Sequence, residues 1–152
     1  MMKIRFGLED NLEVSIYAKS EYNSKQMEEI RLGLLQALDV SQYAKAELDW
    51  DKMNQIRLGL EKNIEVSIYA KSKYNSNQMK EIRLGLENDL DVLIYAKPIF
   101  NWEQMREIRA GLKANVNISV YAKSEFSWAQ LQQITEGLKD NLNVSILSLI
   151  HI

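Results

Sequence analysis

The chain contains no cysteine, a single proline and a single histidine. Without cysteine there can be no disulfide bond and no thiolate metal site, and this composition suits a reducing compartment, so we expect a cytoplasmic protein. The histidine, His151, is the last residue but one and has no cysteine partner for zinc or nucleophilic chemistry. We therefore expect no metal, no cofactor and no catalytic role for this side chain.

An excess of charge of one sign and a long apolar run are also missing. Nineteen basic and 21 acidic side chains give a formal charge of −2, which leaves no general excess of positive charge for binding nucleic acid. The first residues, MMKIRFGLEDN, become polar too soon for a signal peptide. No apolar run approaches the roughly 20 residues that a membrane span requires. The sequence therefore argues against nucleic acid as a general partner and predicts no membrane segment.

The sequence does contain one strong regularity, a period of 26 residues. The phrase Tyr-Ala-Lys starts at residues 17, 43, 69, 95 and 121. All six glycines follow the same period: Gly7, Gly33, Gly59, Gly85, Gly111 and Gly137. A fixed period of this length is typical of stacked units, each of which covers an apolar face of its neighbour. We therefore predict one repeat domain over residues 1–152, built from about six units.

The first half of each unit carries the signals of a helix start. A good capping residue is followed three positions later by glutamine, as in a capping box, and only Lys52 departs from this pattern. An aromatic residue or leucine precedes the cap, and methionine or leucine follows four residues into the helix, which is the spacing of a hydrophobic staple. The long helices should therefore start after Asn23, Asp49, Asn75, Asn101 and Ser127.

The end of each long helix is expected near residue 36 and its equivalents. Asparagine stands where a left-handed C-cap residue belongs, with Asp89 as a tolerable substitute and Ala37 as the exception: Asn11, Asn63, Asn115 and Asn141. The glycine inside each helix costs about 1 kcal/mol relative to alanine. Its recurrence predicts that a neighbouring backbone passes too close to this position for a side chain.

The second half of each unit, such as LEVSIYAKS, permits two interpretations. As a strand, it gives a strand–helix coil like a leucine-rich repeat, because Val14 and Ile16 alternate with more polar residues. As a short helix, it turns Val14, Tyr17 and Ala18 toward the core, with caps at Asp39, Asp91, Asn117 or Asn143. The column that holds Ile16 fits neither interpretation cleanly. We favour the short helix and predict an all-α, right-handed solenoid of about six repeats, each with one long and one short helix.

The string Q-M-x-x-I-R-x-G-L followed by D-V-S-x-Y-A resembles a tandem repeat that occurs in arrays in bacterial proteins of unknown activity. The resemblance covers nearly the whole chain. In such proteins glycine commonly precedes L-D-V-S, proline follows Tyr-Ala-x, and the x before Tyr accepts varied polar residues, which favours the all-α interpretation. Here asparagine or aspartate mostly replaces that glycine, and only Pro98 keeps the proline.

Both ends of the array depart from the pattern of the middle. Counting back one period from Met27 leads to Met1, so Met1–Leu8 should be the remnant of a long helix. At the other end the tyrosine column holds Leu147, and the chain closes on apolar residues rather than on the polar cap that solenoids normally have. We therefore expect end-to-end self-association or an origin from a longer array.

Enzyme motifs are absent from the chain. The sequence contains no G-x-G-x-x-G, P-loop, H-E-x-x-H or G-x-S-x-G. Acidic residues are plentiful, but they recur with the unit, whereas acid–base catalysis needs one asymmetric pair with separated pKa values. The sequence therefore predicts a protein that is not an enzyme.

Three columns of side chains are candidates for binding. Arginine and lysine recur along the array and could hold an acidic partner, although local pairs Arg5–Glu9, Arg57–Glu61 and Arg83–Glu87 account for much of that charge. Tryptophan stands at the first helical position in three units, where it either anchors a partner or packs on the neighbouring cap. The tyrosine column is expected in the core. The candidate partner-binding residues are Trp50, Trp102, Trp128, Arg31, Arg57, Arg83 and Arg109.

The function that fits these patterns is a non-enzymatic scaffold for protein interactions, or a partner-binding repeat module, because stacked units offer a long regular surface. The expected partner is another protein. The alternatives are an inhibitor or regulator of another macromolecule and a nucleic-acid binder that uses the arginine column. An enzyme is the least favoured class.

Overall fold

A computed structural model describes the backbone of residues 14–151 and the side chains of residues 14–141. Within this range the structure contains α-helices and short 3-10 helices and no strand. The all-α prediction is therefore confirmed, and the strand–helix alternative is wrong for these residues. The expected helix remnant Met1–Leu8 and the C-cap at Asn11 lie outside the described residues.

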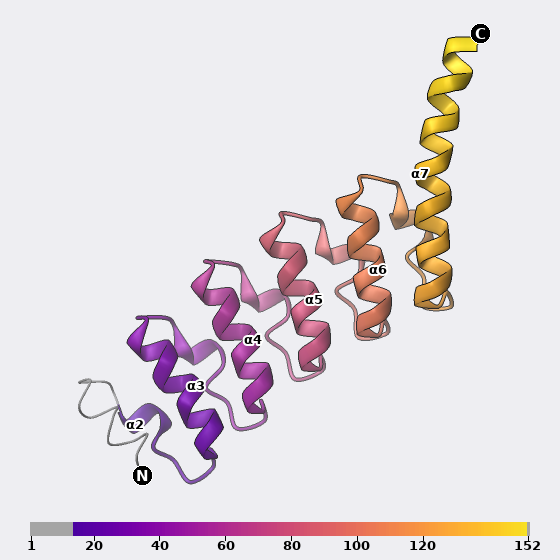
Figure 1. Cartoon of the computed structure of the whole chain (residues 1–152). Coiled ribbons are helices and arrows are strands. Elements are labelled where there is room, and N and C mark those ends of the chain that lie inside the picture. The colour runs from indigo at the N-terminus through magenta and orange to yellow at the C-terminus, as the bar shows by residue number, and fades with distance from the viewer. Residues whose placement is uncertain (1–13, 152) are drawn as a thin grey trace. The chain divides into compact units, whose positions relative to one another are not determined.

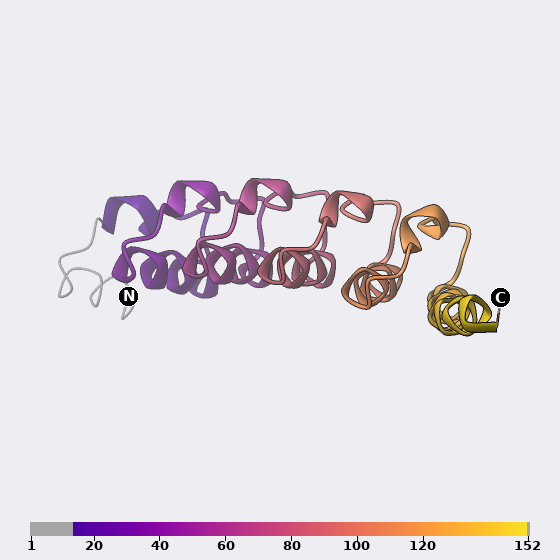
Figure 2. The same cartoon turned by 90° about the horizontal axis from the view of Figure 1, so that it is seen from above.

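The chain divides into two compact units, residues 1–83 and 84–152, with the boundary inside helix α5 (Ser76–Glu87). The prediction of a single repeat domain stays a prediction. The first unit contains long helices α3 (Ser24–Leu35) and α4 (Trp50–Glu61). Its short helices are α2 (Val14–Tyr17), η1 (Val40–Gln42) and η2 (Val66–Ile68). In this unit the short helices form one row and the long helices a second, and α3 packs against α4 (Figures 1 and 2).

The second unit repeats this arrangement. It contains the short helices η3 (Val92–Ile94) and η4 (Ile118–Tyr121) and the long helices α6 (Trp102–Lys113) and α7 (Trp128–His151). Helix α6 packs against α7, and η4 contacts both. Each unit is therefore built as expected for a solenoid, by packing of helices that follow one another in the sequence.

The long helices start where the capping signals predict. The side chain of Asn23 accepts a hydrogen bond from the Gln26 amide (2.9 Å), and the Asn23 amide donates to Gln26 Oε1 (2.8 Å). Asn101 and Gln104 form the same capping box. In the repeat that has Lys52 instead of this glutamine, the Asp49 side chain still accepts a hydrogen bond from the Lys52 amide at 3.4 Å. The predicted helix starts are therefore confirmed.

In four repeats the long helix is followed by a residue with a left-handed backbone conformation. Asn63, Asp89 and Asn115 adopt φ values of 57°, 55° and 59°, as predicted. Ala37 was expected to be an exception, but it adopts φ 57° as well. The following amide, that of Leu38, donates to the Gly33 carbonyl at 2.9 Å and closes the turn. The turn geometry therefore prevails at Ala37, against a steric cost of about 1–2 kcal/mol for a residue with a Cβ.

The last long helix does not end where the repeat predicts. Helix α7 runs through Asn141 and Asn143 to His151 and has 24 residues, twice the length of the others. The predicted C-cap at Asn141 and the predicted short helix after Asn143 are therefore wrong. In the repeats that contain Gly33, Gly59, Gly85 and Gly111, a buried aromatic or aliphatic residue of the short helix packs on the glycine of the long helix. The tyrosine of that short helix is replaced by Leu147 in the last copy, which removes the hydroxyl that anchors it elsewhere.

The repeated glycines make room for side chains of the following short helix. A Cβ at Gly33 or Gly59 would collide with the hydroxyl of Tyr43 or Tyr69. Those hydroxyls donate to the carbonyls of Glu29 (2.6 Å) and Gln55 (2.7 Å), and both tyrosine side chains are fully buried. The expected close approach therefore exists, but it is made by a tyrosine side chain and not by a neighbouring backbone.

The short helices place the tyrosines and most of the valines in the core as the helical interpretation requires, but Ala18, which was also predicted to face the core, is exposed. The tyrosine column is buried at Tyr17, Tyr43, Tyr69 and Tyr95, which confirms its place in the core. In η4 the pattern shifts: Ile118 fills the space at Gly111, and Tyr121 is 36% exposed. The column of Ile16, Gln42, Ile68 and Ile94 lies at the edge and is partly exposed.

Substitution of two glycines by alanine distinguishes the effect of packing on stability from the effect of helix propensity. Gly59→Ala should lower the free energy of unfolding by about 2 kcal/mol, because the new methyl group forces the Tyr69 hydroxyl from its place. Gly137→Ala should raise it by about 0.5–1 kcal/mol, because among the described residues nothing beyond its own stretch of helix lies within 4 Å of that Cβ position and alanine favours the helix. Urea unfolding of both variants checks this. Equal effects at the two sites would contradict the account of the glycines.

The left-handed turn at Ala37 offers a stabilising substitution. Ala37→Asn should raise the free energy of unfolding by about 0.5–1 kcal/mol, because asparagine tolerates this backbone conformation better than alanine. Asparagine already occupies the same position at Asn63 and Asn115. Urea unfolding measures the change, with Ala46→Asn in an exposed loop as the control. A loss of stability in Ala37→Asn alone would contradict the assignment.

Candidate partner-binding surface

Trp50 is the first residue of α4 and lies at the seam between α3 and α4. Its indole is 41% exposed. The ammonium group of Lys25, on α3, lies 4.8 Å from the centroid of the indole ring. Such a cation–π contact at an exposed site contributes about 0.5–1 kcal/mol. Trp50 therefore packs on the preceding helix with one part of its ring and meets solvent with the other.

The tryptophans of the second unit share one cation. The guanidinium group of Arg106 lies 5.2 Å from the ring of Trp102 and 5.6 Å from the ring of Trp128. Trp102 is half-buried, whereas Trp128 is 41% exposed. Arg106 therefore links the first turns of α6 and α7, and the exposed part of Trp128 is available at their edge.

A hollow of about 270 Å³ lies beside Trp50. It is lined by side chains of α3 and by the indole itself: Lys25, Glu28, Glu29, Leu32 and Trp50. The lining combines an aromatic ring, one aliphatic side chain and charges of both signs. This combination suits a protein side chain with an apolar body and a polar end.

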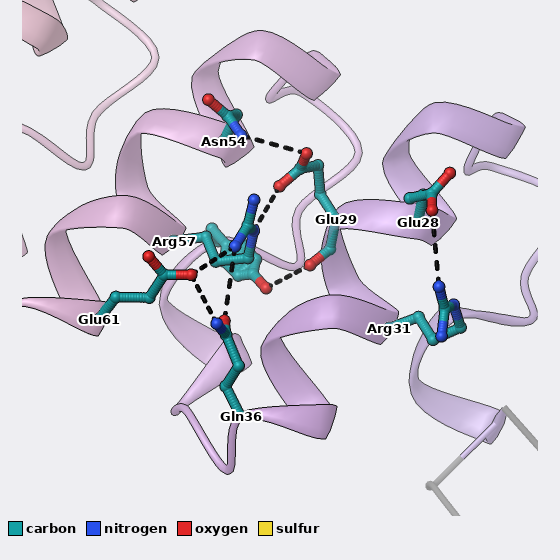
Figure 3. A network of polar contacts seen from close by, with 8 residues as sticks. Glu28, Glu29, Arg31, Gln36, Asn54, Arg57 and Glu61 are labelled. Atoms are coloured by element: carbon teal, nitrogen blue, oxygen red, sulfur yellow. Dashed lines mark hydrogen bonds and ion pairs between the residues drawn. The ribbon is translucent and has the colours of Figure 1, made fainter. Parts of the chain in front are cut away.

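Arg57 lies two helical turns after Trp50 on the same face of α4 and binds across the seam (Figure 3). Its Nε lies 2.7 Å from Glu29 Oε2, and another guanidinium nitrogen lies 2.6 Å from Glu61 Oε1. The side chains of Arg57 and Glu29 are only 12% and 9% exposed. The predicted Arg57–Glu61 pair is confirmed, but the pair with Glu29 on the neighbouring helix was not predicted.

The other arginines of the column also lie close to polar partners. Arg31 contacts Glu28 at 3.5 Å on its own helix (Figure 3), and its side chain is 14% exposed. Arg83, on α5, donates from Nε to Gln55 Oε1 on α4 at 3.0 Å. Arg109 is half-buried. The expected pair Arg5–Glu9 lies outside the described residues. In the first unit Arg57 and Arg83 therefore bind between helices and Arg31 binds on its own helix, so the column is not an open row of charges there.

The capping glutamines have a second role that the sequence did not reveal. While Gln26 Oε1 caps its own helix, its Nε2 donates to the Leu48 carbonyl of the next repeat at 2.7 Å. Gln104 Nε2 donates to the Phe126 carbonyl at the same distance. Lys52, the exception in the capping pattern, makes the forward bond with its ammonium group, which donates to the Ser72 carbonyl at 3.0 Å. The capping box explained the recurrence of glutamine fully, so no signal in the sequence pointed to the second bond.

A larger hollow of about 530 Å³ lies between α2 and η1 on the row of short helices. Its apolar part is formed by Ile16, Tyr22 and Val40, and the exposed ammonium groups of Lys19 and Lys45 belong to its lining. Among the described residues, no group of three or more histidine, cysteine, aspartate or glutamate side chains could hold a metal ion. The search of the same residues found no helix able to cross a membrane.

One pair of carboxyl groups in the first unit has separated pKa values. The side-chain hydrogen bond between Asp49 and Asp51 raises the pKa of Asp49 and lowers the pKa of Asp51. Both stand at the start of α4, where Asp51 also accepts from the Ser76 hydroxyl at 3.1 Å and from the Lys52 amide at 3.0 Å. Neither residue lines the hollows beside Trp50 or between α2 and η1. These contacts describe helix capping rather than a site for acid–base chemistry.

Burial raises the pKa of the Tyr43 phenol above its ordinary value of 10.0, because the ionised form would lose its hydration. Above about pH 10 the unfolded chain releases this proton while the folded chain retains it. The free energy of unfolding should therefore fall as the pH rises above about 10, by up to about 1.4 kcal/mol per pH unit for this group.

Tyr43→Phe tests this pH dependence. The variant should be about 1 kcal/mol less stable near neutral pH, because the hydrogen bond to the Glu29 carbonyl is lost. Its stability should decline less steeply between about pH 9 and about pH 11 than that of the unaltered chain. Urea unfolding over this range measures both effects, with Tyr121→Phe as the control at an exposed tyrosine. An unchanged slope in Tyr43→Phe would contradict the burial of the phenol.

Comparison of the chain with family models, curated proteins and solved structures gave no match.

Proposed function

We propose that the chain is a non-enzymatic interaction scaffold whose repeats bind a partner protein through tryptophan edges, one in each compact unit: Trp50 in the first, and Trp102 with Trp128 in the second. One observation carries this proposal: Trp50, 41% exposed, borders a hollow that also contains Leu32 and Lys25. Tryptophan is among the residues most enriched at the energetic centres of protein interfaces, because its large rigid ring is covered at little entropic cost.

The contacts of Arg57, on the same helix face as Trp50, support a protein partner over a nucleic acid. A phosphate-binding row needs arginines that can leave their present contacts, yet Arg57 is held by both Glu29 and Glu61 and is largely covered. Breaking a partly buried pair of this kind leaves charges without partners. The nucleic-acid alternative therefore carries a cost that binding through Trp50 does not.

The other parts of the proposal rest on the sequence. We propose a cytoplasmic location because the chain lacks cysteine. Membership of the bacterial tandem-repeat proteins rests on the resemblance of the repeated motif. A role as an inhibitor or regulator is one form that a partner-binding module can take, and identification of the partner separates these cases.

The tryptophan edge can be tested by affinity capture from the source cells followed by mass spectrometry. The triple variant Trp50→Ser, Trp102→Ser and Trp128→Ser should lose the partner that the unaltered chain captures, because serine occupies this position in two natural copies and should preserve the fold. The matched control replaces exposed apolar residues elsewhere, Leu93→Ser and Ile99→Ser, which are 66% and 64% exposed. A partner retained by the triple variant would contradict the proposal.

Intrinsic fluorescence provides a direct readout, because all three tryptophans of the chain belong to the proposed edges of the two units. Addition of the captured partner should shift the emission to shorter wavelength as the indoles leave water. A salt titration of the complex separates the alternatives, since phosphate contacts by arginine weaken steeply with ionic strength. A steep salt dependence without a change in emission would favour the nucleic-acid alternative.

A further inference from the structure

Helix α7 exposes a face that is covered in the other long helices. Its residues can be compared with the equivalents one or more periods earlier. Gln130 is exposed, whereas Gln26, Gln78 and Gln104 are only 5%, 6% and 6% exposed. Gln133 is exposed, whereas Glu29, Glu81 and Glu107 are 7%, 5% and 8% exposed. Ile134 is half-buried, whereas Ile30, Ile56, Ile82 and Ile108 are fully buried.

This face therefore retains the side chains of a helix–helix interface without a helix upon it. It forms a hollow of about 410 Å³ that is lined by Phe126, Ala129, Gln130, Gln133 and Ile134. Gly137 lies on the same face, one turn beyond Gln133 and Ile134, and among the described residues nothing apart from its chain neighbours and its own helix backbone lies within 4 Å of its Cβ position. A second helix can approach the backbone closely at such a glycine.

The covered faces within the units show what kind of element fits here. The forward face of α3 is packed by α4, and that of α6 is packed by α7 (Figure 1). In both pairs the occupant is a helix of this same repeat. We therefore expect a helix of this repeat on the uncovered face of α7.

We propose that this face of α7 binds the same face of α7 in a second copy of the chain, which gives a dimer with two-fold symmetry. All five residues that line the hollow are uncharged, so two copies meet without repulsion between these residues. Glutamine both donates and accepts hydrogen bonds, so Gln130 and Gln133 can pair reciprocally with their counterparts. Two-fold pairing is also the commonest arrangement of identical chains.

The charges at the interior seams distinguish this pairing from a head-to-tail stack. Across the seam of α3 and α4, Arg57 of the following helix binds Glu29, and Arg83 binds Gln55 in the same manner. A head-to-tail stack would place an arginine opposite Gln133 by the same rule. A two-fold dimer places Gln133 near the Gln133 of the second copy. The proposal is independent of the partner edge at the tryptophans.

Gln133→Glu gives opposite results for the two arrangements. Glutamate occupies the equivalent position in three other long helices, so the variant should fold. In the two-fold dimer it brings two carboxylates together and should weaken dimerisation about tenfold, with recovery as the carboxylates are protonated. In a head-to-tail stack it should strengthen association, as a new partner for arginine. Sedimentation over a wide concentration range measures the dissociation constant, with Leu93→Glu as the control at an exposed residue outside this face.

Disulfide trapping tests the symmetry itself, because the chain has no cysteine of its own. Single variants Gln130→Cys, Gln133→Cys and Gly137→Cys place a thiol on the face, and Leu93→Cys places one outside it. Under mild oxidation at least one of the three should form a covalent dimer more than about tenfold faster than the control, because only two-fold pairing brings the same residue of two copies together.

Three outcomes would overturn the proposal. The unaltered chain could stay monomeric at every concentration, association could continue beyond the dimer as an open series, or Gln133→Glu could associate more tightly. Circular dichroism of each variant shows whether the helices are retained. Ile134→Glu provides an independent disruption of the apolar part of the face and should also give a monomer.

Discussion

The short helices η1, η2 and η3 are each held in place by a tyrosine that enters a space left by a glycine. The hydroxyl of Tyr43 donates to a carbonyl of the long helix, beside Gly33, and its ring fills the space between the two elements. The left-handed turn at Ala37 supplies the change of direction that this contact needs. The glycine, the turn and the tyrosine therefore depend on one another. The repeat period of 26 residues preserves all three together in most copies.

The last two copies of the repeat show how far the fold depends on this arrangement of glycine, turn and tyrosine. In η4, Ile118 fills the space at Gly111, and Tyr121 is displaced toward solvent. In the last copy the tyrosine is absent from the sequence, and α7 continues as one helix without a turn. The same long-helix sequence pattern therefore ends in a turn or continues, according to what the following residues can pack against it.

The sequence predicted the fold class and the helix starts well because these depend on local chemistry. A cap and the glutamine three residues later bind each other, as Asn23 and Gln26 do, so their spacing is sufficient evidence. The end of α3 near residue 36 was predicted, but the left-handed backbone of Ala37 was not, because tertiary packing overrides the preference of a single residue. The length of α7 was mispredicted because the repeat pattern was extended to a copy that lacks the packing tyrosine.

The candidate site was harder to predict because it depends on contacts between repeats. The sequence placed Trp50 at a part-exposed edge and paired Arg57 with Glu61 on one helix. It did not show that Glu29, a period earlier, binds the same arginine, because nothing local relates these two residues. The uncovered face of α7 could not be predicted either, since its residues match those of covered helices and only the absence of a neighbour distinguishes them.

The double use of the glutamine amide has a consequence for how the protein unfolds. Gln26 joins its own helix start to the loop of the following repeat, so fraying of that loop also removes support from the helix before it. Gln104 creates the same dependence in the second unit. Loss of structure at one repeat is therefore passed backward along the chain within each unit, and neighbouring repeats should melt together rather than one at a time.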